Sequence, residues 1–303
     1  MRNLTIIMYH YVRKIINSKY PGIKGLEISS FKKQLDFLEK NFNIIKPIDL
    51  IQNKSLPDNS CLLTFDDGFK DHVDFVLPEL NKRKLKGCFF PLGAVIIENK
   101  VLDVHLIHFI LAKVKDKSNL ISILNALCIK NGLTEKDLEN YWRLHGKSNR
   151  HDSKEVIYFK RMLQFVLPLD LRENITKLLF KKYLNISANE FAKELYMNKD
   201  DLNKLLEAGM YIGSHSYNHF WLNTLNYQDQ ENEIEKSLNF LKEVGAPTEN
   251  WIMCYPYGSF DDNTISILKE KNCSYAFTSA PGIANLDKDR FRLLRKDTND
   301  FPQ

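Results

Sequence analysis

The sequence is poor in the residues and patterns that mark several protein classes. Its 303 residues include only 12 glycines, 10 prolines and five cysteines. So little glycine and proline argues against a flexible linker or a low-complexity segment. The longest apolar runs, such as Leu4–Tyr9, fall far short of the roughly 18 residues that a membrane helix needs. The sequence therefore predicts no membrane span.

The amino-terminal segment also lacks the layout of a secretory signal. Its apolar run is short, no Ala-x-Ala-like cleavage site follows, and a Tyr-His-Tyr segment interrupts it. An odd number of irregularly spaced cysteines favours buried thiols over disulfides or a cysteine metal cluster. They are Cys61, Cys88, Cys128, Cys254 and Cys273. Together these features predict a protein of the reducing cytoplasm.

Charge and hydrophobicity are close to globular averages. The chain has 43 basic and 38 acidic residues, a net charge of +5, spread along its length. Without a basic cluster, nucleic-acid binding is not expected. With 44% hydrophobic and 27% charged residues, the chain is predicted to fold rather than to remain disordered.

Short apolar runs alternate with helical spacing at both ends of the chain. This alternation predicts a parallel sheet covered by helices, an α/β fold. The expected strands are Leu4–Met8, Cys61–Phe65, Gly87–Phe90, Tyr211–Ser214, Ile252–Tyr255, Tyr275–Thr278 and Phe291–Leu294.

The strand signals vanish from residue 103 to residue 206, where amphipathic helical patterns follow one another. The simplest organisation is a single domain over residues 1–303 with a helical insertion at 103–206. Three roles for the insertion stay open: packing, a homo-oligomer contact, or a lid on the active face.

The segment Thr64-Phe65-Asp66-Asp67-Gly68 carries the first chemical signal. A buried apolar strand ends there in two adjacent carboxylates, which is costly unless a cation holds them. The alternative is a helix cap before residues 71–84, and Asp-Asp alone would favour that alternative.

A second strand end, Ile212–Ser214, is followed by two histidines four residues apart, His215 and His219. Two neutral imidazoles and one carboxylate form a three-ligand site typical of a catalytic divalent metal. Either histidine alone would more simply be a surface residue. Because the carboxyl ends of the strands of a barrel converge on one face, the two strand ends together indicate one site.

Two further strand ends carry candidate groups. In Tyr255-Pro256-Tyr257-Gly258, proline stiffens the turn and glycine permits close approach of the backbone. The Tyr257 N–H could therefore donate a hydrogen bond to a developing oxyanion. A plain strand-to-helix turn is the alternative. The first strand ends in Met8-Tyr9-His10, where a lone histidine is more often structural.

Taken together, these motifs resemble the polysaccharide deacetylases of carbohydrate esterase family 4. The matching segments are Thr64–Gly68, His215–His219, Tyr255–Gly258 and Phe89–Gly93. The resemblance covers about Ile6–Gly93 and Leu205–Asp297, and it implies a distorted (β/α)7 barrel with a large helical insertion.

The resemblance also implies roles for individual residues. Asp67, His215 and His219 would hold Zn²⁺ or another divalent transition metal, and Asp66 would be the catalytic base. Tyr257 would stabilise the oxyanion and, with Pro256 and Tyr9, contact the substrate.

The chain departs from the family pattern at two points. Cys254 stands where many members have an arginine that orients the base, and no histidine follows His219 to act as the usual acid. One branch has an early Tyr-His, which Tyr9-His10 matches, so His10 is assigned the acid role. Arg295 or Asp297 could support Asp66 instead, although a surface ion pair would explain them as well. The remaining histidines, His72, His105, His108, His145 and His151, are expected to be structural or solvated.

The function implied is removal of an N-acetyl group from a nucleotide- or lipid-linked amino sugar in surface polysaccharide or lipopolysaccharide biosynthesis. Two alternatives stay open. One is a catalytically silent carbohydrate-binding homologue, suggested by the missing arginine and late histidine. The other is an amidase or deformylase on another N-acyl sugar, because pocket volume sets acyl specificity.

Overall fold

A computed structural model describes residues 2–52, 54–149 and 152–302. The chain divides into two compact units. The first comprises Met1–Lys14, Gly25–Asn99 and Lys193–Gln303, and the second comprises Ile15–Lys24 and Lys100–Ala192. Among the described helices, none is both long and apolar enough to cross a bilayer.

The first unit is built on a parallel sheet of seven main strands, counted over the residues that the structure describes. In spatial order they are β7 (Tyr211–Ile212), β6 (Gly87–Phe90), β5 (Ser60–Asp66), β1 (Asn3–Tyr9), β11 (Leu293–Asp297), β9 (Tyr275–Pro281) and β8 (Ile252–Cys254). A parallel bridge between Ser214 and Met253 joins the two ends of this order. The sheet is thereby closed into a barrel of seven strands, and the predicted fold class is confirmed.

Short strands flank the barrel. They are β4 (Asn43–Ile44) beside β5, β10 (Ala284–Asn285) antiparallel to β1, and the pair β2 (Val12–Arg13) and β3 (Leu26–Glu27).

Side chains at alternate positions of the strands fill the barrel interior. Each main strand contributes one or more residues at alternate positions to one buried cluster, which includes Leu4, Ile6, Leu62, Cys88, Phe90, Tyr211, Ile252, Cys254, Phe277 and Leu293. Because successive side chains of a strand point to opposite faces, the residues between these point outward, toward the helices. All five cysteines are free and buried, as predicted.

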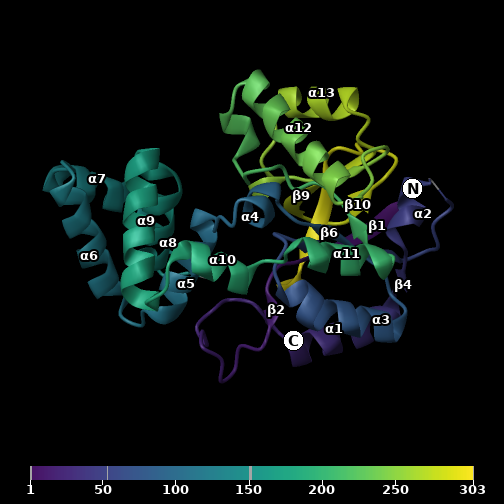
Figure 1. The fold of residues 1–303 in the computed structure, drawn as a ribbon, viewed down its shortest axis with the longest axis horizontal. Coiled ribbons are helices and arrows are strands. Elements are labelled where there is room, and N and C mark those ends of the chain that lie inside the picture. Colours follow the sequence, from purple (N-terminus) through teal and green to yellow (C-terminus); the bar gives the residue numbers. More distant parts are fainter. Residues whose placement is uncertain (1, 53, 150–151, 303) are drawn as a thin grey trace. The chain divides into compact units, whose positions relative to one another are not determined.

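Helices cover the strands of the first unit: Figure 1 shows α12 and α13 together on one side and α1 and α3 on another. Beneath α12 and α13 lies a second apolar cluster that includes Trp251, Met253 and Ile267. The helices of this unit are α1 (Ile28–Asn41), α2 (Pro47–Ile51), η1 (His72–Val76), α3 (Leu77–Arg83), α4 (Gly93–Ile97), α11 (Lys199–Glu207), η3 (Leu222–Thr224), α12 (Tyr227–Glu243), η4 (Pro256–Gly258), α13 (Asp262–Glu270) and η5 (Thr298–Asp300).

The second unit is helical in its described residues. Its helices are α5 (Asp103–Lys113), α6 (Lys117–Lys130), α7 (Glu135–His145), α8 (Lys154–Arg161), η2 (Met162–Val166) and α9 (Leu169–Leu184), while α10 (Ala188–Leu195) runs from this unit into the first. The segment Ile15–Lys24 packs against α5: a Cβ on Gly22 would lie 2.4 Å from the Ala112 carbonyl oxygen. The bounds of this unit thus differ from the expected 103–206, and one domain with an insertion stays a prediction.

Candidate active site

The candidate site lies at the carboxyl ends of the barrel strands, and alternation explains which side chains reach it. Asp66 is four residues beyond Leu62 on β5, and Arg295 is two beyond Leu293 on β11, so both point to the barrel interior. His10 is four residues beyond Ile6, and His215 is four residues beyond Tyr211. Both histidines are therefore an even number of positions from a core residue and point the same way. Residues from four strands therefore converge on one mouth.

A buried ion pair joins Asp66 to Arg295. Two guanidinium nitrogens lie 2.8 and 3.0 Å from the two carboxylate oxygens, and both side chains are almost fully buried. Arg295 also donates to the Thr278 carbonyl (2.8 Å) and to Thr64 Oγ1 (3.1 Å). Burial, the largest single influence, would raise the pKa of Asp66, but Arg295, His215 and His10 together outweigh it, and the pKa is lowered. The carboxylate is therefore held in its ionised form.

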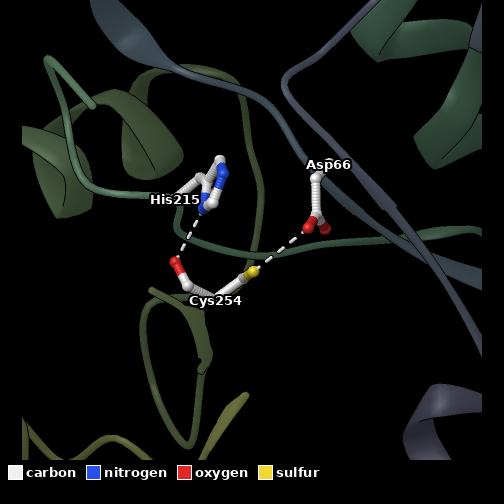
Figure 2. A group of neighbouring side chains, drawn as sticks. All are labelled: Asp66, His215 and Cys254. Carbon is white, nitrogen blue, oxygen red and sulfur yellow. Dashed lines mark hydrogen bonds between the residues drawn. The ribbon is translucent and has the colours of Figure 1, made fainter. Parts of the chain in front are cut away.

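Cys254 contacts both Asp66 and His215 (Figure 2). Its Sγ is 3.4 Å from Asp66 Oδ2, and its carbonyl oxygen is 2.7 Å from His215 Nδ1. Because a carbonyl can only accept, Nδ1 carries the proton and donates it, and Nε2 of a neutral ring keeps its lone pair.

Among the residues that the structure describes, two groups of side chains have metal-ligating atoms within 4.8 Å of one another, and both include His215. The first is Asp66, His215 and Cys254, but Arg295 already pairs with Asp66, and burial raises the pKa of the Cys254 thiol. A protonated thiol is a poor ligand, because metals bind the thiolate. This group does not suit a metal.

The second group is Asp67, His215 and His219, the three predicted ligands. Nε2 of His215 and Nε2 of His219 lie 3.4 and 3.5 Å from the same carboxylate oxygen, Asp67 Oδ1, and all three residues are buried. Two imidazoles and a carboxylate are the donor set of many catalytic zinc sites, and the His215 tautomer leaves the required nitrogen available. The residues present therefore fit a divalent metal, and metal binding itself stays a prediction.

His10 faces Asp66, as its proposed role requires. Its Nε2 lies 3.8 Å from Asp66 Oδ2, and its side chain is 40% exposed. The backbone of His10 is held by His72, whose Nε2 is 2.9 Å from the His10 carbonyl oxygen. Burial lowers the pKa of His72 to about 4, so this ring is neutral and structural.

Left-handed backbone is concentrated at the site. Apart from asparagines and Lys84 at the end of α3, the described non-glycine residues with positive φ are Asp67 (73°), Ser216 (57°), His219 (63°) and Tyr257 (57°). Each costs roughly 1–2 kcal/mol, so the surrounding structure must impose these conformations.

A buried carboxylate on α12 helps to impose this loop conformation. Glu233, 5% exposed, accepts hydrogen bonds from the Asn218 backbone N–H (2.8 Å), the Asn218 side-chain amide (2.5 Å) and the Ser216 hydroxyl (3.4 Å). The Ser216 hydroxyl oxygen in turn accepts from the His219 N–H (3.2 Å). Glu233 thus fixes the segment between the two histidines, and it was not among the residues predicted from the sequence.

The structure corrects one predicted substrate contact. Tyr9 is fully buried and lies between Phe31 and Phe65, with ring centroids 5.3 and 5.1 Å away. Since Tyr9 has the opposite parity to Ile6 on β1, it points to the helices and not into the barrel. Its side chain packs α1 against the sheet, and the prediction that it contacts substrate is wrong.

Some of the remaining predicted residues lie at the site, and others lie elsewhere. Pro256 is buried, and Tyr257 is half-buried with its ring between His219 (4.5 Å) and Trp221 (4.4 Å). Asp297 caps η5 by accepting from the Asn299 N–H (2.9 Å), so of the two proposed supports only Arg295 pairs with Asp66. His105, His108 and His145 belong to the second unit, and His151 lies outside the described residues.

Comparison with known proteins agrees with this geometry. A family model described as polysaccharide deacetylase matches residues 171–276, which include both histidine donors and the Tyr257 turn. The segment that the model matches is therefore similar to polysaccharide deacetylases.

A protein of Bacillus subtilis (strain 168) named as the polysaccharide deacetylase YxkH is 24% identical over 100 residues. The match covers 33% of this chain and 36% of that protein, so the chain spans about a third of its curated relative.

Solved deacetylase structures share the fold. The Streptococcus pyogenes deacetylase PplD, in complex with acetate, superposes with a TM-score of 0.59 at 15% identity, over 98% of this chain and 92% of that one. IcaB from Ammonifex degensii has a TM-score of 0.54 at 18% identity, over 97% and 91%. At such identities the likeness shows the fold alone.

Removing Arg295 should destabilise the protein strongly, because it leaves Asp66 as a buried, unpaired carboxylate. We expect Arg295→Met to lower the free energy of unfolding by about 3–5 kcal/mol. The control Arg292→Met, on a half-exposed arginine paired with Asp289 and Asp262, should change it by less than about 0.5 kcal/mol. Urea unfolding measures both, and equal losses would contradict the assignment.

Glu233→Ala should weaken divalent metal binding by about 10–100-fold, because the loop that carries both histidines loses its anchor. The matched control is Gln230→Ala, another buried polar residue on α12, whose side chain binds Leu225, Asp261 and Thr264 instead. Competition with a chromophoric zinc chelator gives the affinity, and urea unfolding gives the stability. Equal zinc affinity in the two variants would show that Glu233 serves only the fold.

Proposed function

We propose that this chain is a metal-dependent hydrolase that removes an N-acetyl group from an amino sugar. The observation that carries the proposal is a convergence at one barrel mouth. An ionised, buried Asp66 lies beside a cluster of two imidazoles and a carboxylate whose ligating atoms are within 4.8 Å of one another. Hydrolysis of an unactivated amide needs both a base and an electrophile, and this arrangement can provide them.

Asp67, His215 and His219 would hold the metal, with zinc the leading candidate for this donor set. A divalent ion bound there supplies Lewis acidity, which polarises oxygen atoms next to it.

The residues of the chain carry the proton transfers. Asp66 accepts a proton from the attacking water, and its pairing with Arg295 keeps it ionised and correctly oriented. The Tyr257 backbone N–H donates to the oxygen of the acetamido carbonyl as negative charge develops on it. As the C–N bond breaks, His10 gives a proton to the departing nitrogen, and acetate and a free amine result.

The alternative of a silent carbohydrate-binding homologue loses its main motivation. That alternative arose because an arginine and a histidine are missing from their usual positions in the sequence. Arg295 beside Asp66 and His10 at 3.8 Å from it offer groups of the same chemistry from other strands. These contacts favour an enzyme.

The substrate proposed is an N-acetylated amino sugar of surface polysaccharide or lipopolysaccharide biosynthesis, nucleotide- or lipid-linked, and the place of action is the cytoplasm. The deacetylase family model and the deacetylase neighbours support the sugar amide. Five free, buried thiols suit a reducing compartment.

The roles of base and ligand can be separated by substitution. We expect Asp66→Asn to lower acetate release from N-acetylated sugars by at least about 10²-fold while zinc stays bound. His215→Ala should lose both zinc and activity. The control Asp262→Asn alters a carboxylate that is 98% exposed and should retain both.

Coupled acetate assays and metal analysis of purified variants give the two readouts. A normal rate for Asp66→Asn would refute the role of the base. Full zinc content in His215→Ala would refute the ligand set. A panel that includes N-formyl sugars also tests the amidase and deformylase alternative.

A further inference from the structure

The second unit contains a cavity of about 390 Å³. Its volume falls within the range of small-molecule sites, which is roughly 300 to 1,000 Å³. The cavity lies among the segment Ile15–Lys24, the carboxyl-terminal half of α5, the first residue of α6, and α8. All of the lining residues that the structure describes belong to this unit, so the cavity is no part of the candidate active site.

Part of the cavity lining is apolar. Ile23, Leu111, Ala112 and Val156 contribute to it. The segment that carries Ile23 is held tightly against α5, because a Cβ on the neighbouring Gly22 would lie 2.4 Å from the Ala112 carbonyl oxygen. The cavity is therefore preformed, and its apolar part can receive a hydrocarbon group.

The remainder of the lining has an excess of positive charge. The lining residues that the structure describes include Lys24, Lys117 and Lys160 but a single acidic residue, Asp152. The Asp152 side chain is 8% exposed, and its two carboxylate oxygens accept hydrogen bonds from Lys24 (2.5 Å) and from Lys160 (2.7 Å). One carboxylate thus pairs with two lysines, and Lys117 adds a third ammonium group. The described lining therefore carries two more positive charges than negative ones.

Lys117 is fixed at the carboxyl end of α5. Its ammonium group donates to the Leu111 carbonyl oxygen (2.6 Å) and to the Val114 carbonyl oxygen. Burial lowers the pKa of Lys117, and the charge of Lys24 lowers it further. The two ammonium groups therefore repel each other, and an anion bound between them would stabilise both in their charged form.

We propose that this cavity binds a phosphate monoester that carries an apolar substituent. Such a phosphate has a charge of roughly −1.5 to −2 at neutral pH, which matches the excess of two, whereas a carboxylate would balance only half of it. Lysine recognises phosphate as a point charge. Ser153 and Val156, the N-cap and third residue of α8, also line the cavity, so a helix N-terminus adds its favourable field for anions.

The apolar substituent would cover Leu111 and Val156, which the phosphate leaves in contact with water. A soluble alkyl phosphate and a lipid headgroup share this chemistry. The site goes beyond the proposed function, and its test uses binding alone, so that either proposal can fail without the other.

Calorimetric titration of the whole chain at low salt with hexyl phosphate, inorganic phosphate and hexanoate tests the ligand class. We expect hexyl phosphate to bind most tightly, with a gain of about fourfold for each buried CH₂ group. Equal affinity for inorganic phosphate would show that the apolar lining takes no part. Equal affinity for hexanoate would show a carboxylate site. Either result would overturn the proposal, as would the absence of binding by hexyl phosphate.

Substitutions place the ligand in the cavity. Lys24→Met and Lys117→Met should each weaken the binding of hexyl phosphate about tenfold, because each removes a charged hydrogen-bond donor. The matched control is Lys177→Met on α9, which also removes one positive charge. Lys177 is 53% exposed, pairs with Glu173, and is not among the described residues that line the cavity. It should bind as the wild type does.

Urea unfolding checks that the variants are folded. Lys117 also binds carbonyl groups at the end of α5, so Lys24→Met decides the question if Lys117→Met does not fold. Equal weakening in Lys24→Met and Lys177→Met would indicate general charge attraction, and unchanged affinity in Lys24→Met would place the ligand elsewhere. Both outcomes would overturn the proposal.

Vesicles of phosphatidylcholine with and without phosphatidic acid distinguish the two sources of the phosphate. Flotation with phosphatidic acid vesicles that is lost in Lys24→Met and kept in Lys177→Met would support the site with a lipid headgroup as its ligand. Tight binding of hexyl phosphate without flotation would support it with a soluble phosphate monoester. Flotation that both variants retain, with no binding of hexyl phosphate, would overturn it.

Discussion

The ion pair between Asp66 and Arg295 is the interaction on which the rest of the site depends. It joins β5 to β11, two strands that lie on either side of β1. A carboxylate buried in the barrel would ordinarily take up a proton, and Arg295, together with His215 and His10, reverses that tendency. The two neighbouring carboxylates therefore have different surroundings. Asp66 pairs with Arg295, whereas Asp67 lies beside His215 and His219.

Closure of the barrel makes this division possible. Parallel strands bring all their carboxyl ends to one edge, and alternation sends Asp66, Arg295 and Cys254 inward with the core residues below them. Asp67 follows a strand end in the left-handed region, with φ of 73°, and so escapes the alternation. The strain in the turns is thus what separates Asp67 from Asp66, and the barrel supplies the rigidity that sustains it.

Much of this arrangement could be predicted from the sequence. All seven main strands were expected from their apolar runs, and the three candidate ligands were named because they follow two of these strand ends. Arg295 was one of two residues suggested as supports for Asp66. Tyr9 was misjudged because neighbouring residues of a strand point in opposite directions, and proximity in sequence to His10 did not fix its face. Glu233 and Trp221 were missed for another reason. A glutamate within an acidic helix looks solvated, and only the tertiary contacts with Asn218 and Tyr257 distinguish these two residues.

Tyr257 links the candidate metal ligands to the exposed ring of Trp221. Its left-handed backbone directs the amide of the turn, while its ring is held between His219 and Trp221. A ligand that pressed on Trp221 would therefore act on the ring that touches a candidate metal ligand and on the turn that presents the proposed oxyanion donor. Binding energy from a remote part of a substrate can in this way position the reacting centre, which raises the rate only if the contact improves in the transition state. The short, nearly parallel contact of two rings is the structural element that would carry this coupling.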